Sequence, residues 1–456
     1  MARLARSKSP GAQRSAWADE VNAGAPSEGA RLVFEAEHPF RGEPLYRWRL
    51  GNGLTVLVLA DHAAPVVAYH TWFNVGSRHE HPGKTGLAHL FEHLMFGETE
   101  QLAAGGFDRK LEECGAETNA ATWVDWTYYH ELVPADRIKL VVKLEAERMH
   151  GLVLREPQVA SEKEVVANER RYRVEDDVEG LANELLYKTA FERHPYQWPT
   201  IGWMQDIQNL SPEDCVAFYR TYYAPNNATV VVVGDVRERD LLLAIRDAYG
   251  GIASQPIPPE DVVPEPPQLA ERSLVLNKPS ASEKLLVAFK GPALGDADHA
   301  ALTVLSEVLF GGRASRLYRT LVVDREFAID VRGWASTFRD PGLFECSVTG
   351  RASHTAIEIL PLLDEAFSRV RADVVGEEEL ARAKARLELG SLQQLETAGG
   401  KAEQIGFYEM VLGDPAHAFR RVDAFRRATA SDLRRVARRY LVDTARTVLR
   451  VVPEHG

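Results

Sequence analysis

The sequence predicts an α+β fold of two homologous α/β-sandwich halves, each a mainly antiparallel sheet covered by helices. Residues 211–235 and 430–453 both have the pattern of a capped helix, a turn and a buried strand, and Tyr440 follows Tyr222 by 218 residues. Strand and helix patterns mix without the strict alternation that is typical of a parallel sheet. Residues 250–272 hold six prolines and no periodicity, which indicates a linker between the halves.

These boundaries divide the chain into four parts. In chain order we expect a disordered extension (1–40), a domain with the histidine motif described below (41–249), the proline-rich linker (250–272) and a homologous domain without metal ligands (273–456). Both domains are long enough to bury a hydrophobic core of their own.

Hydrophobic periodicity and turn residues predict the elements of the first half. The expected elements are two strands around the Asn52-Gly53 turn (45–61), a strand (65–77), helices at 86–96 and 105–115, a strand (118–133), and helices at 134–154 and 157–174. Because the order is mixed, we expect an antiparallel or mixed sheet with helices on it.

The composition excludes several classes of protein. Of 456 residues, 45% are hydrophobic and 26% charged, with no apolar run of membrane-spanning length, so we expect no membrane span. A net charge of -12 argues against nucleic acid as a partner. Three scattered cysteines predict neither a disulfide framework nor a thiolate zinc site.

The first thirty residues lack the continuous apolar segment of a secretory signal. Arg3, Arg6, Lys8 and Arg14 precede any acidic residue, which weakly resembles an organellar transit peptide. We expect a cytoplasmic location.

The helix predicted at 86–96 places His89 and His93 four residues apart, with Glu92 between them. On a helix this spacing puts both imidazoles on one face, about 5–6 Å apart at Cβ. They are either hydrogen-bonded residues at a helix edge or metal ligands. The aligned helix of the second half has other residues at these positions, namely Thr303, Ser306 and Glu307. A purely structural need for histidine would apply to both halves, so the difference favours a metal site.

Zinc suits such a nitrogen and oxygen ligand set, and a catalytic zinc has three protein ligands. Glu92 would lie near enough to take a proton from a water at the ion without being a ligand. The helix at 157–174 offers Glu162, Glu164 and Glu169 as a third ligand. Glu162 and Glu169 lie two turns apart on one face, whereas Glu164 points elsewhere.

From about residue 45 onward the chain resembles the M16 family of zinc peptidases, the inverzincins. The family signature is H-x-x-E-H followed by a glutamate 76 residues after the second histidine, which is Glu169 here. The resemblance implies one zinc ion on His89, His93 and Glu169, with Glu92 as catalytic base and Glu162 as an accessory residue. It also implies a zinc endopeptidase that cuts extended peptides in a chamber between the two halves.

The family's N-A-x-T stretch, which lies on an edge strand beside the zinc and takes the substrate as an added strand, falls here on Asn119, Ala120 and Ala121. Asn119 could instead be an ordinary turn or strand-end residue. The other histidines that attract notice are expected to be structural: His70, His130 and His194.

The chain departs from the family at one point. Active members of the family contact the substrate with an Arg and a Tyr that lie seven residues apart in the second half. In this chain the two positions hold Val322 and Ile329. We therefore expect a homologous partner subunit that supplies the pair, or a homodimer, as the length of the shorter M16 subfamily also implies. The alternative function is a non-catalytic zinc-binding partner or scaffold subunit.

Overall fold

The computed structural model describes residues 10–40, 42–260 and 263–454. These residues form two compact units, and each unit combines stretches that are distant in the sequence. The first unit consists of Met1–Glu164, Gln205–Glu260 and Gln394–His417, and the second of Val165–Met204, Asp261–Gln393 and Ala418–Gly456. Among the described helices, none has the length and apolar character that crossing a membrane requires.

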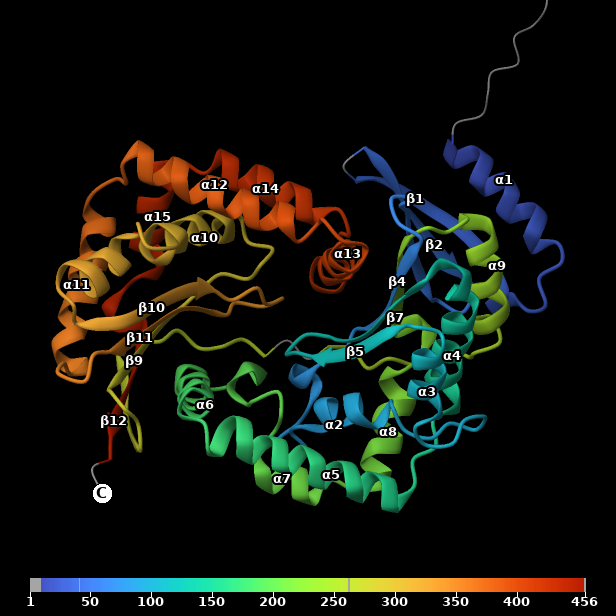
Figure 1. Ribbon diagram of the computed structural model, residues 1–456, viewed down its shortest axis with the longest axis horizontal. Helices are drawn as coiled ribbons and strands as arrows, with labels where there is room; N and C mark the ends of the chain where they lie inside the picture. The colour runs from blue at the N-terminus through green and yellow to red at the C-terminus, as the bar shows by residue number, and fades with distance from the viewer. Residues whose placement is uncertain (1–9, 41, 261–262, 455–456) are drawn as a thin grey trace, which may run out of the picture. The chain divides into compact units, whose positions relative to one another are not determined.

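The first unit is built on a seven-stranded sheet (Figure 1). Its strand order is β1-β2-β3-β7-β4-β6-β5, antiparallel throughout except for the parallel pair β3 and β7. The strands are β1 (Leu32–Phe40), β2 (Glu43–Leu50), β3 (Thr55–Ala60), β4 (Val66–Phe73), β5 (Glu117–Thr122), β6 (Thr127–Pro134) and β7 (Ala228–Gly234).

Helices cover both faces of this sheet. On one face, α4 (Ile138–Gly151) and α9 (Glu238–Tyr249) pack together, and the Thr71 hydroxyl of β4 donates to Glu145 of α4 at 2.7 Å. On the other face, α13 (Ala398–Leu412) packs on β4 and β7. There a Cβ on Gly406 would lie only 2.1 Å from the indole nitrogen of Trp72, so glycine permits the close approach of α13.

The single strand expected at 118–133 is two strands, β5 and β6, joined by a tight turn at 123–126. Tertiary contacts fix this turn: the Trp123 and Val124 carbonyls accept from backbone amides of residues 77 and 78, and Asp125 pairs with Arg78 at 3.1 Å. The aromatic and β-branched residues around Asp125 favour strands, and a single Asp among them was too weak a turn signal to interrupt the predicted strand.

The expectation of disorder over 1–40 was wrong for the described part, residues 10–40. Helix α1 (Pro10–Asn22) and strand β1 form there, while residues 1–9 lie outside the described residues. Arg14 makes a paired contact with Glu238 of α9, and Trp17 packs edge-on against Trp48 with ring centroids 5.7 Å apart. These partners are distant in sequence, so the polar composition alone did not reveal them.

The second unit is built on a five-stranded sheet in the order β10-β11-β9-β12-β8, with β8 and β12 parallel. Read from its other edge, this order matches β3-β7-β4-β6-β5 of the first sheet, which supports the duplication seen in the sequence. The strands are β8 (Arg272–Lys278), β9 (Lys284–Lys290), β10 (Ala328–Ala335), β11 (Leu343–Gly350) and β12 (Arg446–Pro453).

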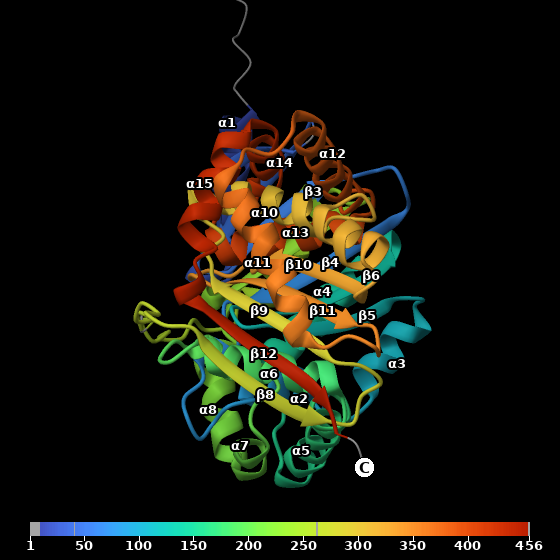
Figure 2. The same ribbon diagram turned by 90° about the vertical axis from the view of Figure 1, so that its left-hand side faces the viewer.

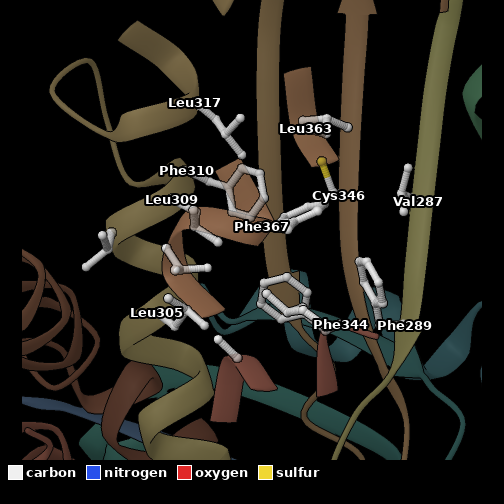
Figure 3. Close-up of a cluster of buried hydrophobic side chains, with 14 of the residues drawn as sticks. Val287, Phe289, Leu305, Leu309, Phe310, Leu317, Phe344, Cys346, Leu363 and Phe367 are labelled. Carbon is white, nitrogen blue, oxygen red and sulfur yellow. The ribbon is translucent and has the colours of Figure 1, made fainter. Parts of the chain in front are cut away.

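Helices α10 (Ala297–Phe310), α11 (Ala356–Ala372), α12 (Glu377–Gln393), α14 (His417–Arg427) and α15 (Ala430–Tyr440) complete this half. The core lies between α10 and the sheet, where side chains such as Leu305, Leu309 and Phe344 are buried (Figure 3). The α+β fold of two sheets covered by helices is thus confirmed.

Each compact unit contains a helix that belongs to the other half of the sequence. Helix α6 (Val178–Ala190) packs on β8, β9 and β12 of the second unit (Figure 2). Conversely, α13 belongs to the first unit. The predicted boundaries at 41–249 and 273–456 follow the two sequence repeats, whereas the compact units exchange these segments.

Candidate metal centre

Helix α2 (Leu87–Leu94) carries the histidine motif on a half-buried side. Its opposite side is buried, and the Phe91 ring lies 5.5 Å from Tyr219 and 4.4 Å from Tyr223 at the end of α8 (Pro212–Tyr222). This packing fixes the helix and keeps His89, Glu92 and His93 on its half-buried side.

The N-terminus of α2 is capped by a carboxylate that the sequence analysis missed. Gly86 takes a left-handed conformation with φ of 87°, and Glu80 accepts from the amides of Gly86 at 2.9 Å and Ala88 at 2.7 Å. Burial raises the pKa of Glu80 well above its usual range, and these donors oppose that shift. An acidic group satisfies the unpaired amides of a helix start.

Helix α5 (Glu156–Arg170) supplies the glutamates. The boundary between the two compact units falls within α5, after Glu164. Glu162 and Glu169 lie on this one continuous helix, so the helix fixes their positions relative to each other. Lys163 donates to the carbonyls of Gln208 and Leu210, and Arg170 pairs with Glu184 at 2.7 Å. Both ends of the glutamate-bearing segment are therefore anchored.

His89, His93 and Glu169 come together as the sequence predicts. One ligand atom from each lies within 4.8 Å of the others, and no other trio of His, Cys, Asp or Glu in the described residues is placed this closely. The two imidazole centroids are 5.0 Å apart. Two imidazoles and a carboxylate are the donor set of a catalytic zinc site, so the residues fit that ion.

Glu162 lies beside this trio. Its Oε2 is 3.5 Å from Nδ1 of His93, which suits a residue that orients a ligand. Glu164 is exposed on another side of α5. The carboxylate of Glu169 also contacts Arg173 at 3.0 Å, a partner whose side chain is mostly in solvent.

Glu92 is half-buried on α2 and lies outside the trio. Its charge acts on Tyr128 of β6: burial is the main cause that raises the pKa of this phenol, and the charges of Glu403 and Glu92 add to it. The charge of Glu92, the candidate base, is therefore felt at β6, the strand that pairs with β5.

Strand β5 ends the strand order of the first sheet, and its partner among the described residues is β6 alone. Asn119 pairs with His130, Ala120 with Tyr129 and Ala121 with Tyr128. Helices α2 and α3 (Gly106–Glu113) both pack against β5. The predicted substrate strand is therefore an edge strand beside the helix of the histidine motif.

The three other histidines have structural surroundings. His70 is buried, and burial, with the nearby His130, lowers its pKa to about 3. Burial and Arg148 lower the pKa of His130. Nε2 of His194 lies 3.1 Å from Asp340, away from the trio.

Val322 and Ile329, at the positions of the family's Arg and Tyr, lie in the second unit. Val322 packs partly against its core, and Ile329 is 58% exposed on β10, an edge strand. Neither side chain can donate a hydrogen bond.

A second buried feature escaped the sequence analysis. Arg148 of α4 is buried between Glu145 and Glu131, donates to Glu131 at 3.1 Å, and lies 4.4 Å over the rings of Phe107 and Tyr129. Two carboxylates share one guanidinium, so burial and the neighbouring Glu145 raise the pKa of Glu131 well above its usual value. This cluster ties α4 to β6 and α3 behind the edge strand. The spacing of Glu145 and Arg148 on one helix face was its only sequence signal.

Comparison with known proteins relates the chain to one family. The model of the insulinase family, peptidase family M16, matches residues 55–202, and the model of the M16 inactive domain matches residues 209–387. The zinc protease PqqE of Helicobacter pylori is 30% identical over 89% of this chain and 92% of its own length. A probable mitochondrial-processing peptidase subunit beta of Arabidopsis thaliana is 24% identical over 86% of this chain and 76% of its own. The crystal structure of a protease from Helicobacter pylori, 30% identical, matches with a TM-score of 0.86 and covers 89% of this chain and 99% of that one.

Proposed function

Because the chain belongs to peptidase family M16, we propose that it is a zinc-dependent endopeptidase. In this proposal His89, His93 and Glu169 hold one zinc ion, and Glu92 is the catalytic base. The observation that carries it is the trio on α2 and α5, whose ligand atoms lie within 4.8 Å of one another. The relative that is 30% identical over 89% of this chain is itself named a zinc protease.

A zinc ion held by His89, His93 and Glu169 would supply a Lewis acid for the peptide carbonyl and for the attacking water. Glu92 lies one position before His93 and takes the proton of that water, then passes it to the leaving amine. Glu162, 3.5 Å from Nδ1 of His93, would hold the imidazole of this ligand in a fixed orientation.

Strand β5 provides the means to hold an extended peptide or an unfolded protein segment. An edge strand offers backbone donors and acceptors to an added strand, which gives affinity with little demand on side chains. The small side chains of Ala120 and Ala121 leave room for a peptide to approach this edge.

The chain is proposed to act with a second subunit of the same fold. Val322 and Ile329 offer no hydrogen-bond donor for the substrate, so a homologous partner that carries donors at these positions would have to supply one. A relative is named as subunit beta of a processing peptidase, which fits a paired enzyme. These two residues also favour the alternative, a non-catalytic zinc-binding subunit.

The test is a Glu92→Gln variant assayed for metal and for peptide cleavage. We expect it to retain about one zinc per chain and to lose hydrolysis, because the ligands remain while the proton acceptor is gone. Glu164→Gln, an exposed glutamate on α5, is the control and should match the unmodified protein in both assays. Loss of zinc in Glu92→Gln would show that Glu92 is a ligand. Unchanged hydrolysis would exclude it as the base.

A further inference from the structure

We propose that Arg148 is a positioning residue that holds the edge strand β5 and the metal ligands of α2 in a fixed relation to each other. It acts through three side chains that it contacts, namely Phe96, Tyr129 and Glu131. The inference rests on the proposed function, and it adds a residue that controls how a bound peptide is placed at the metal site.

The second half shows how the fold fills the equivalent interface without such a residue. Helix α11 follows β11 as α4 follows β6, so the two helices are equivalent in the duplicated fold. The core between α11 and β11 is formed by apolar side chains, which include Phe344, Cys346, Leu363 and Phe367 (Figure 3).

The first half instead buries two carboxylates and one guanidinium between α4 and β6. None of Arg148, Glu131 and Glu145 is more than 1% exposed. Removing these charged groups from water is costly, and apolar side chains in place of such a cluster are often at least as stabilising. Because the cluster lies in the half that carries the histidine motif and the edge strand β5, we relate it to them rather than to the stability of the fold.

Arg148 contacts the segment that follows helix α2. Its guanidinium carbon lies 5.4 Å from the centre of the Phe96 ring. The Phe96 amide in turn donates to the His93 carbonyl at 3.1 Å, and the Phe96 ring lies 6.1 Å from that of Tyr129. Arg148 therefore limits the position of the residue that comes three places after a metal ligand.

The same guanidinium fixes β6, the strand that pairs with β5. It donates to Glu131 at 3.1 Å and lies 4.4 Å over the Tyr129 ring. In the strand register Glu131 pairs with Thr118, and Tyr129 pairs with Ala120. Directly opposed residues of antiparallel strands lie on one face of the sheet and contact each other. The two pairs therefore hold β5 at the positions on either side of Asn119.

The guanidinium is itself held in place by other elements of the first unit. Glu145 of α4 pairs with it and accepts from the Thr71 hydroxyl of β4, an interior strand, at 2.7 Å. Phe107 of α3 lies 4.4 Å from it, and α3 packs against β5 as well. Arg148 is thus a fixed point that the end of α2 and the partner strand of β5 share.

This arrangement matters because hydrolysis depends on where the peptide carbonyl lies. A peptide added to β5 takes its position from that strand, whereas two of the metal ligands and Glu92 take theirs from α2. A misplacement of about 1 Å between reacting groups can lower the rate by about 10²-fold. Loss of the shared contact should therefore lower kcat, while KM changes little because backbone hydrogen bonds at the strand edge still bind the peptide.

The experiment replaces the cluster with apolar residues, as in the second half. The full-length variant carries Glu131→Leu, Glu145→Leu and Arg148→Met together. We expect it to fold, to retain about one zinc per chain and to keep its KM, with kcat lower by about 10²-fold. Arg148→Lys keeps the positive charge but loses the planar fork of donors, and its kcat should lie between the two.

Arg446 of β12 provides the matched control. It is also buried and shared by two carboxylates, Glu271 at 2.6 Å and Asp364, but it belongs to the half without the histidine motif. Arg446→Met should lower the free energy of unfolding and leave kcat unchanged. An equal loss of kcat in this variant, at the same folded fraction, would overturn the proposal, because any buried arginine would then have the same effect.

A second readout measures position without hydrolysis. Cobalt(II) accepts the same nitrogen and oxygen ligands as zinc. Because it is paramagnetic, it shifts the NMR signals of nearby methyl groups by amounts that depend on their distance and direction from the ion. Labelled methyl groups of Ala120 and Ala121 then report where β5 lies relative to the metal. We expect both shifts to change in the triple variant and to stay unchanged in Arg446→Met.

Unchanged methyl shifts in the triple variant would overturn the positioning role, whether or not kcat falls. If the triple variant and Arg148→Lys both fail to fold, Arg148 serves the fold and the proposal fails as well. Changed shifts in a protein that cleaves no peptide would support the positioning role and exclude the proposed peptidase activity. Cleavage that neither variant alters would do the reverse.

Discussion

Helices α2 and α10 occupy equivalent places in the duplicated fold, and they differ in what their polar residues do. Each packs against the edge strand of its sheet, α2 against β5 and α10 against β10. On α10 the residues that align with the motif are used by the fold itself: Ser306 donates to the Gly333 carbonyl at 2.8 Å, and Glu307 pairs with Arg386. On α2 the two histidines of the motif, His89 and His93, converge with Glu169 instead.

The comparison separates the needs of the fold from those of the chemistry. A helix beside the edge strand is required in both halves, and apolar residues such as Leu90 and Leu305 bury its inner side in each. Packing of this helix does not require imidazoles, because α10 packs in the same place with Thr303 and Glu307 at the aligned positions. The site is thus an addition to one copy of a common scaffold.

The largest effect should follow from giving α2 a residue of α10. His89→Thr introduces the residue found at position 303, and we expect zinc content to fall from about one per chain to none after dialysis against a mild chelator. Two ligands remain, which is too few for a stable zinc site. The free energy of unfolding of the metal-free protein should change by less than about 1 kcal/mol, because position 89 is half-buried.

Metal analysis and denaturant melts measure both quantities. His62→Thr, at an exposed histidine paired with Asp235, is the matched control and should keep its zinc. Zinc retained in His89→Thr would contradict the assignment. A large loss of stability in the metal-free variant would mean that His89 serves the fold.

The second prediction tests what the second half lacks. We expect the purified chain alone to cleave peptides about 10²–10³-fold more slowly than with a partner that supplies donors to the developing oxyanion. Val322→Arg combined with Ile329→Tyr should recover part of this rate, and Ile329→Phe, which adds the ring without the hydroxyl, is the control. Full activity of a homogeneous preparation, unchanged by any partner or by these substitutions, would exclude the split site.

A third comparison concerns buried carboxyl groups next to the two edge strands. Glu131 of β6 shares the guanidinium of Arg148, whereas Glu345 of β11 accepts from neutral donors, the Tyr187 hydroxyl at 2.5 Å and the Trp334 indole at 3.1 Å. Burial raises the pKa of Glu345 from 4.5 to about 7, and both donors oppose the shift. The pKa of Glu345 predicts that the stability of the second sheet depends on pH between about 4.5 and 7.

The folded protein holds the Glu345 proton up to about pH 7, whereas the unfolded chain releases it near pH 4.5. The contribution to stability is therefore complete below pH 4.5 and is lost as the pH rises to about 7, by roughly 3 kcal/mol. Glu345→Gln should flatten this part of the profile of unfolding free energy against pH. Glu358→Gln, at an exposed acid of α11, should not, and an equally steep profile in Glu345→Gln would refute the prediction.

The features of the molecule that depend on local residue spacing could be predicted from the sequence. The pair His89 and His93 follows from helix geometry, and the duplication follows from aligned strands and helices. Glu169 needed the family resemblance, because residue spacing left three glutamates of one helix open. The exchange of α6 and α13, the turn at 123–126 and the anchoring of α1 depend on partners far away in sequence, and no local pattern encodes them.

The smallest effect is expected within α5, and it tests whether Glu162 and Glu164 differ as their directions indicate. Glu162 lies 3.5 Å from Nδ1 of His93, while Glu164 is exposed. Glu162→Gln should weaken zinc affinity or peptide cleavage by roughly 10–100-fold, since a residue that orients a ligand costs that much when it is changed. Glu164→Gln removes the same charge from the same helix and should change either quantity by less than about twofold, because surface substitutions of this kind cost little. Zinc titration against a competing chelator measures the affinity separately from the rate. Equal losses in both variants would mean that only the net charge of α5 matters, and the proposed contact between Glu162 and His93 would have to be abandoned.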